Sequence, residues 1–194
     1  MARVNRDGVM MDDGAPHLGG NRPGGDPLCM CPDVWSYLAW RYKIKSVFDV
    51  GCGTGETMRY FQQLGCDTVG IDGMQANVDQ CPPIAKVFDI CGPEKWSTFD
   101  VFDLVWCCEV VEHIDEAHVD VLLDLLTSGL HLAMTHAVPG QPGYHHVNCQ
   151  PAEYWIEKIE ARGMRFDLET TKFVQSLILD NENYFKKTGL IFHA

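Results

Sequence analysis

Ser46-Val47-Phe48-Asp49-Val50-Gly51-Cys52-Gly53-Thr54-Gly55-Glu56 is the stretch that decides the fold. Its first five residues, 46–50, are mostly β-branched and aromatic, which predicts a short strand. The glycines at 51, 53 and 55 let the backbone turn sharply and approach a ligand closely. Residues 56–64 then place apolar side chains on one side of a helix. The stretch therefore predicts a strand, a glycine loop and a helix.

Position 56 separates two classes of ligand for this loop. A dinucleotide site of the G-x-G-x-x-G type needs a small residue there. The residue is Glu56, whose charge would face a pyrophosphate. The loop thus favours a ligand without phosphate over NAD, although an ordinary tight turn would also account for the glycines.

The alternation of strand and helix continues outward from this unit. Further strands are predicted at 68–72, 85–90, 102–107, 130–137, 164–168 and 190–193. Helices are predicted at 33–40, 117–126 and 151–162, and residues 170–184 suit a helix and a loop. This order predicts the α/β class: a Rossmann-like three-layer sandwich with a mostly parallel seven-stranded sheet covered on both faces.

Acidic residues follow three successive strands, at the edge where such sheets bind ligands. Asp72 ends the second strand, where a carboxylate can accept both hydroxyls of a ribose. Asp89 ends the third strand, where a carboxylate can receive the exocyclic amine of an adenine. Glu109 follows the fourth. Each alone is typical of a cap or turn, but together with the glycine loop they predict an adenosine site.

The composition limits the partners and the compartment. The chain has 194 residues, 46% hydrophobic and 22% charged, as expected of one compact domain. Its 15 basic and 27 acidic residues give a net charge of −12, which disfavours binding to nucleic acid. Neither a membrane span nor a secretory signal is apparent. Nine scattered cysteines, an odd number, indicate reduced thiols and a cytoplasmic protein.

Residues 1–32 differ from the rest because they are rich in glycine and proline and show no periodicity. They predict a loop-like arm rather than a second domain. The arm is either a poorly ordered tail or a lid that carries His17, Asn21 and Arg22 to the site. Arg22 could then pair with a ligand carboxylate.

Three motifs give residues 34–194 a resemblance to a known family: VFDVGCGTGE at 47–56, GIDG at 70–73 and FDLVWCCEVVEHI at 102–114. In combination they resemble the class I S-adenosylmethionine-dependent methyltransferases, whose seven-stranded sheet has its last strand antiparallel. The resemblance implies a methyltransferase domain at 33–194, preceded by the arm, with S-adenosylmethionine as cofactor. A narrower resemblance of residues 135–150 and 17–25 is to a small subgroup, with several members in phages, that implies no substrate.

The same resemblance implies which residues bind the cofactor. The loop 51–55 would hold its methionine part, and Asp49 would orient that loop or the amino group. Asp72 would bind the ribose, and Asp89 would read the adenine. The full set is Asp49, Gly51, Cys52, Gly53, Gly55, Asp72, Gly73, Met74, Asp89, Ile90, Cys108 and Glu109.

The loop after the fifth strand lies over the transferred methyl group in this fold. It is dense in polar side chains: His136, Tyr144, His145, His146 and Asn148. One histidine could act as a general base for an oxygen acceptor, or the histidines could only bind substrate. A third alternative is a metal ion, joined by Glu112 or Asp103.

The sequence favours catalysis by a histidine, His146 before His145 and His136, without a metal. The predicted function is methyl transfer to a small-molecule or sugar acceptor, at oxygen. The alternatives are a methyltransferase acting on protein or nucleic acid, and a catalytically silent partner subunit that only binds the cofactor.

Overall fold

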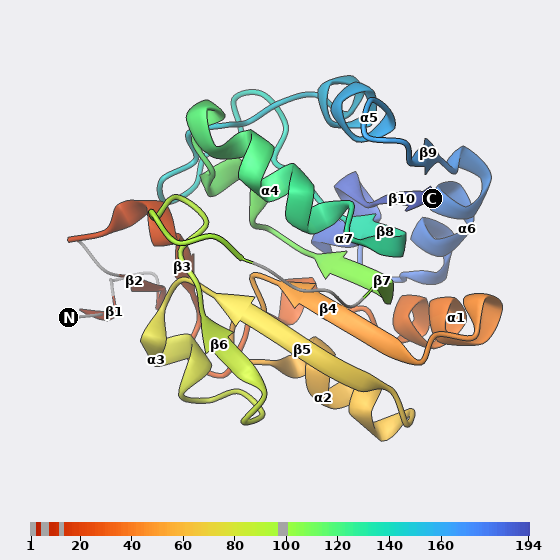
Figure 1. Cartoon of the computed structure of the whole chain (residues 1–194), viewed down its shortest axis with the longest axis horizontal. Coiled ribbons are helices and arrows are strands. Elements are labelled where there is room, and N and C mark those ends of the chain that lie inside the picture. The colour runs from red at the N-terminus through yellow and green to blue at the C-terminus, as the bar shows by residue number, and fades with distance from the viewer. Residues whose placement is uncertain (1–2, 5–7, 12–13, 97–100) are drawn as a thin grey trace.

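The computed structural model describes residues 3–4, 8–11, 14–96 and 101–194, and its centre is a seven-stranded sheet (Figure 1). The strand order is β6-β5-β4-β7-β8-β10-β9. The strands are β4 (Ser46–Val50), β5 (Asp67–Asp72), β6 (Ala85–Val87), β7 (Phe102–Cys107), β8 (Gly129–Met134), β9 (Arg165–Phe166) and β10 (Leu190–His193). Strand β10 runs antiparallel to both of its neighbours, and the other strand pairs of this sheet are parallel. The predicted fold, including the antiparallel last strand, is confirmed.

Helices cover both faces of the sheet because side chains along each strand alternate between two cores. Phe48 and Val105 pack into one core with α4 (Val119–Leu126) and α5 (Ala152–Glu160). Val47 and Trp106 point the other way. They pack toward α1 (Pro32–Tyr42), α2 (Glu56–Gln63), α6 (Leu168–Leu177) and α7 (Tyr184–Thr188). The short helix α3 (Gln75–Val78) lies between β5 and β6, where the sequence predicted no helix.

Strand β8 ends at Met134 rather than at residue 137, and two further strands end earlier than the sequence predicts, each for a local reason. Strand β6 stops at Val87, and the chain then turns as the side chain of Asp89 accepts from the amide of Cys91. Strand β9 stops at Phe166 because Asp167 caps α6 by accepting from the amide of Thr170. The spacing of apolar residues, from which the strands were predicted, does not reveal side-chain hydrogen bonds of this kind.

The arm folds over the carboxyl ends of the strands. It contains strands β1 (Arg3–Val4), β2 (Met10–Met11) and β3 (Gly20–Asn21), which form a small antiparallel sheet. It also has two 3-10 turns, η1 (Pro16–Leu18) and η2 (Pro27–Cys29). In Figure 1 the arm lies on the side toward which the arrowheads of β5 and β7 point. The domain boundary near residue 32 remains a prediction.

No helix within the described residues is long and apolar enough to cross a membrane.

Candidate functional site

A cavity of about 280 Å³ lies at the carboxyl ends of β4, β5 and β7. This is the switch point of the sheet, because the chain order reverses between β4 and β7. The cavity brings together most of the predicted cofactor residues: Asp49, Gly51, Cys52, Gly53, Asp72, Gly73, Asp89, Ile90, Cys108 and Glu109. Gly55 and Met74 do not line it. The arm supplies a second wall, so elements far apart in sequence enclose one space.

The glycine loop has a backbone that side chains would disturb. Gly51, Gly53 and Gly55 have φ values of 73°, 53° and 87°, in the left-handed region. A Cβ on Gly51 would lie 2.2 Å from Cγ2 of Val110, and one on Gly53 would lie 2.5 Å from Nδ2 of Asn21. At Gly53 the loop therefore lies directly against the side chain of Asn21 from the arm, an approach that a side chain at position 53 would disturb.

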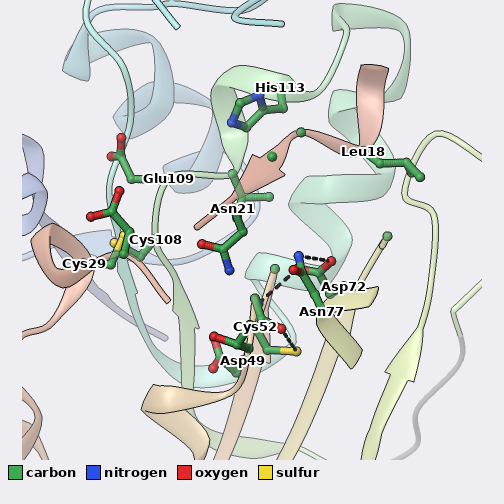
Figure 2. Close-up of a pocket in the computed structure, with 18 of the residues that line it drawn as sticks. Leu18, Asn21, Cys29, Asp49, Cys52, Asp72, Asn77, Cys108, Glu109 and His113 are labelled. Atoms are coloured by element: carbon green, nitrogen blue, oxygen red, sulfur yellow. Dashed lines mark hydrogen bonds between the residues drawn. The ribbon is translucent and has the colours of Figure 1, made fainter. Parts of the chain in front are cut away.

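Asp72 ties the glycine loop to the end of β5 (Figure 2). Its Oδ2 accepts from the amide of Gly53 at 3.0 Å. Its Oδ1 accepts from the amide of Met74 at 2.8 Å and from Nδ2 of Asn77 at 2.9 Å. Burial raises the pKa of this carboxyl to about 6 despite these three hydrogen bonds. Oδ1 already accepts two hydrogen bonds, whereas Oδ2 accepts one and has a further lone pair that a hydroxyl in the cavity could use.

Asp49 is a buried acid with an unmet hydrogen-bonding need. Its side chain is 2% exposed, and Oδ2 has no hydrogen-bond partner. Burial, together with Cys81, Asp72 and Glu56, raises its pKa well above the ordinary value. A buried carboxylate of this kind is stabilised by a cation or by a proton. An ammonium group above the glycine loop would supply the cation.

Two residues of the arm, His17 and Asn21, lie close to predicted cofactor-binding residues. His17 Nε2 lies 3.0 Å from Oδ2 of Asp89, the predicted adenine reader. Figure 2 shows Asn21 reaching from the arm toward the space above Asp49, Cys52 and Asp72. Arg22 also lines the cavity, but its Nε lies 3.4 Å from Asp26, so its charge is already paired. Neither Asn77 nor Leu18, both of which line the cavity, was found from the sequence.

Past β7, a group of acids and histidines forms the far end of the cavity. Glu109 has φ of 56°, and its Oε1 accepts from Oγ1 of Thr135 at 2.9 Å. Burial raises its pKa. Glu112 and His113 belong to the 3-10 turn η3 (Val111–His113) and line the same end. The sequence treated Glu112 only as an additional metal ligand and His113 as structural.

The three predicted histidines lie in different places. His146 lines the cavity with Tyr144, and its Nδ1 is 3.7 Å from Sγ of Cys149. His145 has φ of 54° and does not line the cavity. His136 is 3% exposed and faces a second hollow, between the loop after β8 and helices α5 and α6. The structure therefore brings His146 alone of the three to the cofactor residues.

A family model described as a methyltransferase domain matches residues 27–163. The chain belongs to this family. The prediction of a class I S-adenosylmethionine-dependent methyltransferase is thereby confirmed. Among curated proteins, none matches the sequence of this methyltransferase.

Solved structures share the fold of the methyltransferase. A SAM-dependent methyltransferase from Archaeoglobus fulgidus is 18% identical, with a TM-score of 0.57 over 85% of this chain and 95% of that one. The magnesium protoporphyrin IX methyltransferase ChlM from Synechocystis PCC 6803, with bound SAM, is 17% identical, with a TM-score of 0.57 over 82% and 74%. The plantazolicin methyltransferase BpumL, in complex with SAH, is 14% identical, with a TM-score of 0.59 over 92% and 85%. At these identities the likeness concerns the fold.

Proposed function

We propose that this methyltransferase transfers a methyl group from S-adenosylmethionine to a hydroxyl of a small molecule or sugar unit. The observation that carries the proposal is one cavity with two chemically different ends. Asp49, Gly53 and Asp72 form one end, and Glu109, Glu112 and His146 form the other. The first set suits a cofactor, and the second suits an acceptor that must lose a proton.

The cavity residues fit S-adenosylmethionine on two counts. The Oδ2 of Asp49, which has no partner among the described residues, suits an ammonium group, and Gly53 lines the cavity with a backbone at a φ of 53° that favours glycine. Asp72 would accept hydrogen bonds from the ribose hydroxyls. Asp89 would accept from the exocyclic amine of the adenine, with one of its carboxylate oxygens also bonded to His17. When bound, the cofactor supplies an electrophilic methyl group on a sulfonium. The chain's own residues have to hold the acceptor in line and exclude water.

The covering arm favours a small acceptor over a macromolecule. Gly20, Asn21 and Tyr144 line the cavity from above, so the site is roofed rather than open to an extended surface. The net charge of −12 supports the same choice against nucleic acid. All nine cysteines are free thiols, which supports activity in a reducing compartment such as the cytoplasm.

Of the three predicted histidines, His146 is the one that we propose contributes to the acceptor site, because His145 and His136 lie outside the cavity. The test is an acceptor screen with labelled S-adenosylmethionine against sugars, nucleosides, amines and cell-extract fractions. Mass spectrometry should find the label on an oxygen of a small product. Label on protein or nucleic acid would contradict the acceptor class. Cofactor binding without any product from any fraction would instead identify a silent partner subunit.

A further inference from the structure

Three side chains at the acceptor end of the cavity converge, although they come from two separate segments. Glu112, His113 and His146 each offer one ligand atom, and these atoms lie within 4.8 Å of one another. All three residues line the cavity. The two imidazole rings have centroids 5.1 Å apart and planes at 80°. Such rings do not stack, and their nitrogens can point at one shared position.

Glu112 needs a positive partner. Its side chain is 0% exposed, and neither Oε1 nor Oε2 has a hydrogen-bond partner among the residues that the structure describes. A buried, isolated carboxylate is unfavourable by several kcal/mol unless it is paired or protonated. The neighbouring charge that acts on it most strongly is Glu109, a second carboxylate, which adds to the negative potential. A cation bound beside Glu112 would pair with its carboxylate and would offset the negative potential of Glu109.

The two histidines are held in the way that ligating imidazoles usually are. His113 has no partner on Nδ1, while backbone carbonyls of Tyr144 and His145 hydrogen-bond its ring. A carbonyl on one nitrogen fixes the tautomer and leaves the other nitrogen as a ligand. In His146 the Nδ1 lies 3.7 Å from Sγ of Cys149, and the backbone of Gln141 hydrogen-bonds the ring.

We propose that Glu112, His113 and His146 bind a divalent transition-metal cation. Two imidazoles and one carboxylate suit Mn²⁺, Co²⁺ or Zn²⁺ better than Mg²⁺, which prefers oxygen ligands. Three protein ligands leave positions open toward the cavity, where an acceptor oxygen would bind. That use of the ion rests on the proposed function, whereas binding of the ion does not. The sequence favoured a site without metal because the adjacent His145 and His146 would point apart in an extended chain and no carboxylate lies within their loop.

The test is equilibrium dialysis of the full chain, stripped with chelator, against Mn²⁺, Co²⁺, Zn²⁺ or Mg²⁺ alone, followed by metal quantification. One transition-metal ion should bind per chain, and Co²⁺ should give the visible absorption of a nitrogen- and oxygen-ligated site. Glu112→Gln and His146→Ala should each weaken binding at least about tenfold, which is the lower limit seen even for groups behind the ligands. His145→Asn, a matched control in the same loop that tolerates positive φ, should bind normally.

Thermal melting guards against variants that fail to fold. Mn²⁺ should raise the melting temperature of the wild type and of His145→Asn, but not that of Glu112→Gln. Unchanged binding in both ligand variants, or loss of binding in the control as well, would overturn the site. Calorimetry with S-adenosylhomocysteine separates the two proposals. Metal binding without cofactor binding leaves this site standing and refutes the proposed function.

Discussion

Asp72 is the residue on which we expect cofactor binding to depend most directly, because it joins the glycine loop to the end of β5. We predict that Asp72→Ala weakens S-adenosylhomocysteine binding by at least about tenfold. A hydrogen bond to a charged group contributes about 1.5–3 kcal/mol, and about 1.4 kcal/mol corresponds to a factor of ten. Calorimetry measures the affinity, with Asp79→Ala as a folded control because Asp79 bonds only to exposed Gln75. Equal affinity in the two variants would remove Asp72 from the site.

The raised pKa of Asp72 also predicts a pH dependence. Burial raises the pKa to about 6, and bonds from ribose hydroxyls favour the ionised form. Affinity for S-adenosylhomocysteine should therefore fall as pH decreases from about 7.5 to about 5. In the cofactor-free protein the sign is reversed. The folded pKa exceeds the ordinary 3.8, so the contribution of Asp72 to the free energy of unfolding is lost as pH rises through about 6.

Asp72→Asn is the control for this pH dependence, because it cannot titrate. Relative to that variant, the wild type should lose stability in urea between about pH 5 and about pH 7.5. A constant difference between the two proteins would show that Asp72 is already ionised at the lower pH.

Gly53 is the second position at which one residue decides binding. We predict that Gly53→Ala abolishes cofactor binding while the chain still folds. A Cβ would enter the space below Asn21, at a φ of 53°. Gly140→Ala is the matched control, since its φ is 83° but nothing lies within 4 Å of the added atom. Normal binding by folded Gly53→Ala would make the loop an ordinary turn.

At the scale of elements, the sequence left two roles open for the arm, a poorly ordered tail or a lid over the site. We predict that deleting residues 1–25 preserves the sheet but lowers turnover and cofactor affinity. Its contacts with the site come from His17, Gly20 and Asn21, and the two large buried cores contain no residue before Cys31. Circular dichroism and calorimetry on the truncated protein make the measurement. Full activity after truncation would show that the arm is only a tail.

At the scale of the whole molecule, cofactor binding should raise stability through mass action. S-adenosylhomocysteine at a hundred times its dissociation constant adds about 2.7 kcal/mol. For a chain of this size that corresponds to a rise of about 5–11 °C in melting temperature. Scanning fluorimetry measures it, with adenosine alone as the weaker ligand for comparison. NADH should give no shift, because Glu56 follows the glycine loop and would face a pyrophosphate. A rise in melting temperature with NADH but not with S-adenosylhomocysteine would identify the site as one that binds dinucleotides.

The sequence predicted the sheet well because buried strands carry a local signal. Residues 46–50, 102–107 and 190–193 were predicted with their observed bounds. The arm's strands escaped prediction because two residues are too short to show alternation. The sequence also did not predict that His113 and His146 lie next to each other, for a different reason. That contact depends on how the loop after β8 folds back on η3, through bonds from the amides of Val147 and Asn148 to the carbonyl of Glu112.

The roof of the cavity and its floor come from different stretches of the chain. The floor is the sheet with its glycine loop, in which a change at Gly51 would strike Val110. The roof is the arm, which is continuous in the chain with α1. Because His17 contacts Asp89 and Asn21 lies against Gly53, a substitution in one of these walls changes what the other packs against. In evolutionary terms, we therefore expect the two stretches of chain to change together.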